Sequence, residues 1–132
     1  TFKNKHIYLT PKNGKYTQVI IWLHGFGDSP KSFIDFFETG GIVPDGNKVK
    51  AVLLQAPTLP STATGGFLVP SWFDIIKFPI DSEKCFNFSQ AQSSAKALIN
   101  IIEEEAKLLM ENIKIFLLED FLKGLVFHYI RD

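Results

Sequence analysis

The amino-acid sequence predicts an α/β fold, in which a parallel sheet is flanked by helices. Three continuous apolar runs predict its strands: VIIWLH (residues 19–24), KAVLLQA (50–56) and IKIFLL (113–118). Unbroken apolar runs are typical of strands that are buried on both faces, as in a parallel sheet. Segments of helical pattern separate the runs, and such helices connect parallel strands by right-handed crossovers. We therefore expect residues 19–24, 50–56 and 114–117 to form parallel strands of one sheet.

The first connecting helix is expected to begin at residue 30. Ser29 and Pro30 have the pattern of a helix N-cap followed by proline at the first helical position. The segment KSFIDFFET then places three phenylalanines at helical spacing, and a Gly-Gly pair at residues 40–41 ends it.

The second connecting helix, over residues 89–110, has the clearest pattern. Ser89 and Gln92 have the spacing of a capping box, so Ser89 is the predicted N-cap. The opposite face carries Glu103, Glu104, Lys107 and Glu111. One apolar stripe, which we expect to pack on the sheet, consists of Ala91, Ala95, Leu98, Ile99, Ile102, Ala106 and Leu109.

Composition indicates a globular chain of about one domain, because its 132 residues are 45% apolar. Fourteen basic and 14 acidic residues balance, so charge gives no support for binding nucleic acid or an anionic membrane surface. No apolar run is long enough to span a membrane. The single Cys85 and the lack of a signal-like leader predict a cytoplasmic, reducing location.

Two stretches carry chemical patterns. LHGFGDSP runs from the first strand into a glycine-rich turn, where backbone N–H groups can converge on an oxyanion or a phosphate; an ordinary strand-to-helix turn is the alternative. PSWFDI follows the loop STATGGF, which is expected to be flexible. Its Trp72, Phe73 and Asp74 indicate either an apolar substrate groove or core packing with a helix-capping aspartate.

Taken together, these stretches resemble the acyl-protein thioesterase and small carboxylesterase (lysophospholipase-like) family of α/β-hydrolases. The resemblance rests on VIIWLHGFGDSP, LLQAPTLPSTATGGFLVPSWFDI, the QAQSSAKALINIIEEE helix and the IKIFL strand, and it covers residues 16–117. It implies the amino-terminal half of an α/β-hydrolase sheet. It also implies hydrolysis of acyl thioesters or esters in acylated proteins or lipids, without metal or cofactor.

The resemblance also assigns roles to individual residues. The N–H of Phe26 would be one donor of an oxyanion hole. The residues that would support its turn are His24, Gly25, Gly27 and Asp28. The acyl groove would be lined by Phe67, Leu68 and Trp72.

The catalytic serine that the family requires is missing. A nucleophile elbow, G-F-S-Q-G, should directly follow the IKIFL strand, but residues 119–124 read EDFLKG. Ser89, in the similar NFSQA, precedes a helix instead of following a strand. His6, His24 and His128 have no triad context, and the family's aspartate and histidine would lie beyond Asp132.

The elbow is present in a shifted reading frame. Permitted codons for residues 118–124, TTG GAG GAT TTT CTC AAG GGG, read G-G-F-S-Q-G once the first two bases are dropped. A chance match of this kind has a probability on the order of 10⁻⁷. We therefore expect residues 1–132 to be a single truncated domain with an out-of-frame tail over 118–132. Two hypotheses follow: a serine hydrolase whose sequence is damaged here, or a non-catalytic binding or decoy module.

Overall fold

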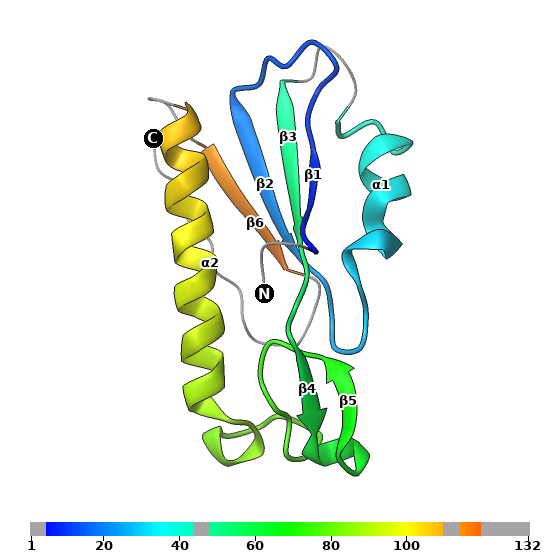
Figure 1. The fold of residues 1–132 in the computed structure, drawn as a ribbon, viewed down its shortest axis with the longest axis vertical. Coiled ribbons are helices and arrows are strands. Elements are labelled where there is room, and N and C mark those ends of the chain that lie inside the picture. The colour runs from blue at the N-terminus through cyan, green and yellow to red at the C-terminus, as the bar shows by residue number, and fades with distance from the viewer. Residues whose placement is uncertain (1–4, 44–47, 110–113, 120–132) are drawn as a thin grey trace.

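The computed structural model describes residues 5–43, 48–109 and 114–119 (Figure 1). Its centre is a four-stranded sheet with the strand order β1-β3-β2-β6. The strands are β1 (Ile7–Leu9), β2 (Gln18–Leu23), β3 (Val49–Leu54) and β6 (Lys114–Glu119). A two-stranded hairpin of β4 (Thr58–Ser61) and β5 (Phe67–Pro70) extends below this sheet.

The three predicted parallel strands are confirmed. β2 pairs in parallel with β3 on one side and with β6 on the other, so that Ile21 lies opposite Val52 and Leu117. Strand bounds differ from the prediction by one or two residues. β1 was not predicted; it pairs antiparallel to β3 and contains only three residues, too few to show a periodic pattern.

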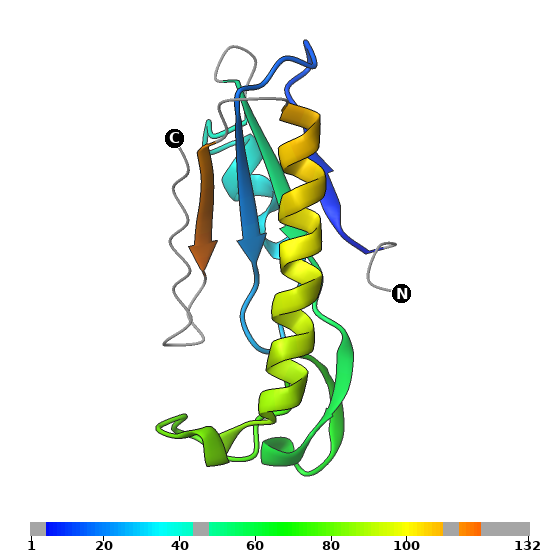
Figure 2. The same ribbon diagram turned by 90° about the vertical axis from the view of Figure 1, so that its left-hand side faces the viewer.

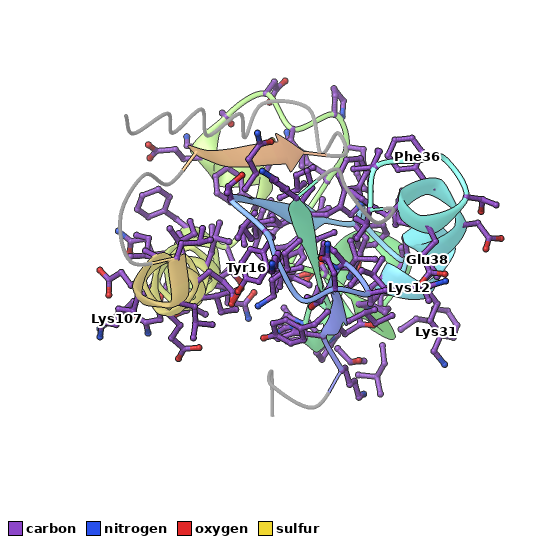
Figure 3. All side chains as sticks on the ribbon, turned by 90° about the horizontal axis from the view of Figure 1, so that it is seen from above. Lys12, Tyr16, Lys31, Phe36, Glu38 and Lys107 are labelled. Carbon is purple, nitrogen blue, oxygen red and sulfur yellow. The ribbon has the colours of Figure 1, made fainter. Side chains whose placement is uncertain are left out.

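Two helices cover opposite faces of the sheet (Figures 2 and 3). Val19 and Ile21 of β2 pack in one buried cluster with Leu98 of α2 (Phe88–Leu109). The alternate residues of β2, Ile20 and Trp22, pack with Phe37 of α1 (Ile34–Glu38). Successive side chains of a strand point to opposite faces of the sheet. A strand with consecutive apolar residues can therefore contribute to the buried cluster under α2 and to the one under α1.

The first helix is shorter than predicted. A 3-10 turn, η2 (Pro30–Phe33), precedes α1, and Pro30 occupies its first turn as expected. Ser29 stands at the N-cap position, but its side chain makes no capping hydrogen bond, which corrects that part of the prediction.

The second helix begins one residue earlier than predicted and has a different cap. The Oδ1 atom of Asn87 accepts a hydrogen bond from the N–H of Gln90 at 3.0 Å, the geometry of an N-cap. Ser89 lies exposed inside the first turn, so its predicted capping role is wrong. The apolar stripe packs largely as expected, but Ile99 is exposed and Glu105 is buried.

The STATGGF segment, which was expected to be a flexible loop, has regular structure over most of its length. This segment contains the end of β4, the short turn η3 (Thr62–Thr64) and the start of β5. The backbone N–H and the hydroxyl of Thr62 both donate to the carboxylate of Asp74. Asp74 therefore caps a 3-10 turn that lies 12 residues earlier in the chain.

Candidate active site

The turn that follows β2 lies at the carboxyl end of the parallel strands. Leu23, the last residue of β2, is level with Leu54 of β3 and Glu119 of β6. The carboxyl ends of β2, β3 and β6 therefore lie at the same edge of the sheet. In open α/β sheets, ligands bind outside this edge.

His24 holds the base of the turn and is buried. Its Nδ1 atom lies 2.7 Å from the carbonyl oxygen of Gly25, and its Nε2 atom lies 3.0 Å from the backbone N of Ala56. Since a carbonyl can only accept and an amide N–H can only donate, the imidazole must be neutral, with its proton on Nδ1. Burial lowers the pKa of His24, which favours the same neutral form.

The backbone donors of the turn are used unequally. The N–H of Gly27 donates to the carbonyl of Pro70 at 2.9 Å, and the N–H of Asp28 donates to the carbonyl of Gly25 at 3.1 Å. The N–H of Phe26, the residue before Gly27, donates to no acceptor within residues 5–43, 48–109 and 114–119. It is the donor that the resemblance assigns to an oxyanion hole.

Gly27 is required by the backbone conformation of the turn. Its φ is +78°, in the left-handed region that favours glycine. A Cβ atom there would lie 3.7 Å from Cγ1 of Val69, an ordinary contact, so the conformation and not the available space demands glycine.

Asp28 connects the turn to the 3-10 turn η2 that follows it. Its Oδ1 atom accepts hydrogen bonds from the hydroxyl of Ser32 at 2.6 Å and from the N–H of Ser29 at 2.7 Å. The Ser32 hydroxyl, with the Ser29 N–H and nearby His24, lowers the pKa of the Asp28 carboxyl. Asp28 thus ties the end of the turn to Ser29 and Ser32 at the start of the next element.

Trp72 lies beneath the turn and is buried, which confirms the core-packing interpretation of PSWFDI. Its Nε1–H donates to the carbonyl of His24 at 2.8 Å, and its ring centroid lies 5.3 Å from that of His24. The role of Trp72 as a wall of the acyl groove stays a prediction.

The other predicted groove residues lie on the hairpin. Phe67 and Leu68 of β5 are 75% and 70% exposed, the largest exposed fractions among the large apolar side chains of residues 5–43 and 48–109. Phe78, which sequence reasoning did not single out, packs edge-on against Phe26 with ring centroids 5.9 Å apart. Its position in a loop without periodicity left no sequence signal that could have found it.

Glu119, the first position of the expected elbow, is the last residue that the structure describes. Residues 120–132, which include His128 and the rest of that expected motif, lie outside the described residues. Within the described part of the chain, no cluster of three or more histidine, cysteine, aspartate or glutamate side chains could hold a metal ion. No helix there is long and apolar enough to cross a membrane.

Comparison with known proteins gives consistent matches. The sequence model of the phospholipase/carboxylesterase family (Abhydrolase_2) matches residues 4–118. Acyl-protein thioesterase 1 of Debaryomyces hansenii is 33% identical over 85 residues, which are 61% of this chain and 37% of that protein. A rice protein (Oryza sativa subsp. japonica) named as a probable inactive carboxylesterase is 38% identical over 69 residues, 50% of this chain and 27% of that protein.

The fold also matches a solved structure. The crystal structure of Zea mays acyl-protein thioesterase 2 superposes with a TM-score of 0.66 at 26% identity, covering 86% of this chain and 45% of that chain. The chain thus spans less than half the length of each of these relatives. Because the family match extends over most of the sequence and the sheet has the corresponding architecture, the chain belongs to the phospholipase/carboxylesterase family of α/β-hydrolases.

Proposed function

We propose that this chain is the amino-terminal part of a serine hydrolase that cleaves acyl thioesters or esters, with the Phe26 N–H as one donor of the oxyanion hole. The observation that carries this proposal is the pattern of hydrogen bonds in the turn. Gly27 and Asp28 use their N–H groups within the fold, whereas that of Phe26 has no acceptor among the described residues. A preorganised N–H at a sheet edge is what an oxyanion needs.

The nucleophile would come from the segment that follows β6. Since Leu23 is level with Glu119 across the β2–β6 pair, the carboxyl end of β6 lies beside the carboxyl end of β2, from which the turn with Phe26 begins. A serine in a strand-to-helix elbow there would attack the acyl carbonyl, and the negative charge on the carbonyl oxygen would be held by two backbone N–H groups. A histidine, oriented by an aspartate, would take the proton of the serine and deliver it to the leaving thiol or alcohol.

Apolar side chains near the turn support an acyl substrate. The edge-on pair of Phe26 and Phe78 adjoins the turn, and the hairpin that bonds to the turn through Pro70 presents Phe67 and Leu68 to solvent. Exposed apolar surface next to a polarising donor suits an acyl chain attached to a protein or a lipid.

The chain as written has no serine after β6, and we propose that a frame change at about residue 118 accounts for this. The end of the family match at residue 118 supports the proposal. Sequencing of the transcript across the codons for residues 115–132 tests it. We expect the bases for G-G-F-S-Q-G in the shifted frame, followed in that frame by codons for an aspartate and then a histidine.

Activity measurements test the reaction itself. The longer protein encoded by the shifted frame should hydrolyse p-nitrophenyl and thioester acyl substrates and bind a fluorophosphonate probe, and alanine in place of its elbow serine should abolish both. The 132-residue chain should do neither. Labelling of Ser89, or of any other serine of the short chain, would contradict this assignment.

The second candidate function is a non-catalytic binding module. The lack of a serine after β6 favours it, and so does the similarity to a rice protein named as a probable inactive carboxylesterase. A transcript without the shifted G-G-F-S-Q-G codons, together with binding of a non-hydrolysable acyl thioether by the 132-residue chain, would establish this function over the enzymatic one.

We further propose a cytoplasmic location. Cys85 is a buried free thiol, which is compatible with a reducing compartment. Fractionation of cells that express the protein tests this, and recovery in the secreted fraction would contradict it.

A further inference from the structure

Two consecutive peptide groups lead to the Phe26 N–H, and a side chain holds each of them. The carbonyl of His24 accepts a hydrogen bond from Nε1–H of Trp72 at 2.8 Å. The carbonyl of Gly25 accepts one from Nδ1–H of His24 at 2.7 Å. The second carbonyl belongs to the same peptide group as the Phe26 N–H.

A planar peptide group transmits this restraint directly. In a trans peptide the C=O and the N–H lie in one plane and point in opposite directions. A hydrogen bond that fixes the Gly25 oxygen therefore fixes the direction of the Phe26 N–H. It also polarises the peptide, which makes that N–H a stronger donor.

Both residues are themselves anchored to other elements. His24 accepts a hydrogen bond at Nε2 from the N–H of Ala56, just beyond β3. The carbonyl of Trp72 accepts a hydrogen bond from the hydroxyl of Ser94 in α2. The direction of the Phe26 N–H is thereby tied to both the sheet and the long helix.

We propose that Trp72 and His24 are positioning residues of the oxyanion hole, in which Trp72 fixes the His24–Gly25 peptide and His24 fixes the Gly25–Phe26 peptide. This inference rests on the proposed function. It gives Trp72 a role that differs from lining the acyl groove, because an indole N–H that bonds to the turn acts on the rate of reaction and not on the binding of an acyl chain.

The other tryptophan provides a matched control. Trp22 packs on the opposite face of the sheet against Phe33 and Phe37, with its indole half-buried. Its Nε1 atom is buried and has no hydrogen-bond partner among the described residues. Trp22→Phe therefore makes the same change of ring size as Trp72→Phe without removing a hydrogen bond to the turn.

The first test uses NMR spectra of the 132-residue chain. Trp72→Phe should shift the Phe26 amide resonance and raise the hydrogen-exchange rate of the neighbouring Gly27 amide about tenfold, the effect of weakening one hydrogen bond. Trp22→Phe should leave the Phe26 resonance in place and change the Gly27 rate less than about twofold. Equal effects of the two variants on these amides would overturn the proposal.

The second test uses the longer, shifted-frame protein. Trp72→Phe should lower kcat about tenfold and leave KM within about twofold for acyl chains of every length, since a misdirected donor weakens the transition state more than the ground state. His24→Asn, which retains an N–H near Gly25, should keep more activity than His24→Ala. A KM that instead rises with acyl-chain length in Trp72→Phe would show a groove wall and overturn the positioning role.

The two tests separate this inference from the proposed function. If the longer wild-type protein hydrolyses no acyl substrate, the proposed function fails, and the NMR comparison, recorded on either chain, still decides whether Trp72 helps to hold the Phe26 peptide. If the wild-type protein is active and Trp72→Phe matches Trp22→Phe in kcat, only the positioning inference fails.

Discussion

Two histidine side chains accept the backbone N–H groups that follow β3. Nδ1 of His6 accepts from the N–H of Gln55, and Nε2 of His24 accepts from the N–H of Ala56, both at 3.0 Å. Burial lowers the pKa of both imidazoles, and for His24 the Gly25 carbonyl and Asp28 oppose this effect only in part. Protonation would place a donor where each of these bonds needs an acceptor, so both histidines are built to stay neutral.

These lowered pKa values predict acid sensitivity. Because the folded protein binds protons less readily at His6 and His24 than the unfolded chain does, their contribution to stability is complete above about pH 6.5 and declines as the pH falls below it. The free energy of unfolding, measured by urea denaturation between pH 7.5 and 5, should fall by at most about 1.4 kcal/mol per pH unit for each histidine. His24→Gln should reduce this slope. An unchanged slope in the His24→Gln and His6→Gln variants would show that other groups cause it.

Gly27 provides a second prediction at the residue scale. Its φ of +78° makes alanine strained, so Gly27→Ala should lower the free energy of unfolding by about 1 kcal/mol and shift the Phe26 amide resonance. Gly14 is the matched control, since its φ is +70° and a Cβ atom there would have no neighbour within 4 Å. Gly14→Ala should cost a similar free energy and leave the Phe26 resonance unchanged. A shift of that resonance in both variants would indicate a general loss of structure.

At the scale of the element, the start of α2 depends on residues that are distant in sequence. Asn87 caps the helix through its Oδ1 atom, and its own N–H donates to the carbonyl of Asp74. The side chain of Gln90, which a capping box would direct back to Asn87, instead accepts from the N–H of Asp74. Two hydrogen bonds therefore join the start of the helix to the PSWFDI segment, which also contains Trp72.

The N-cap assignment can be tested by two alanine variants. Asn87→Ala should lower the free energy of unfolding by about 1 kcal/mol, the usual cost of losing a capping side chain. Ser89→Ala, inside the exposed first turn, should change it by less than about 0.5 kcal/mol. Urea denaturation followed by circular dichroism measures both. The reverse order of effects would restore Ser89 as the cap.

At the scale of the whole molecule, an ion pair joins the long helix to the sheet. Nζ of Lys50 in β3 lies 2.5 Å from Oε1 and 3.1 Å from Oε2 of Glu105 in α2, and both residues are buried. The ammonium also lies 5.4 Å from the ring centroid of Tyr8 and 5.3 Å from that of Tyr16. Figure 3 shows Tyr16 between α2 and the strands. The aromatic faces offset part of the cost of removing the charge from water.

Removing one charge of this ion pair should destabilise the protein strongly, whereas replacing both residues with apolar ones should not. Glu105→Gln leaves the buried Lys50 charge without its counterion and should lower the free energy of unfolding by about 3 kcal/mol. The double variant Lys50→Met, Glu105→Leu should lose much less, because it removes both charges together. Glu103→Gln, on the exposed face of α2, is the control and should change stability by less than about 0.5 kcal/mol. Additive effects of the single variants Lys50→Met and Glu105→Leu in the double variant would contradict direct coupling.

The parts of the fold that sequence predicted share one physical basis. The parallel strands are mostly apolar, with β2 and β3 buried on both faces, and α2 shows a helical period over 22 residues, so both signals are long and repeated. The burial of Glu105 could not be predicted because its partner, Lys50, lies 55 residues away in the chain. The caps were misassigned at Ser29 and Ser89 because competing acceptors, Asp28 and Asn87, stand within two residues of each.

The sequence alone determined the family, the parallel strands and the turn that contains Phe26, because these depend on local residue order and on apolar runs. Only the tertiary structure shows that the Phe26 N–H has no acceptor among the described residues, and that Trp72 and His24 donate to the carbonyls of the His24–Gly25 and Gly25–Phe26 peptides. The physical reason is that a hydrogen bond joins groups by position in space. The N–H of Trp72 and the carbonyl of His24 are 48 residues apart in the chain, and only the packing of the PSWFDI segment beneath β2 brings them together.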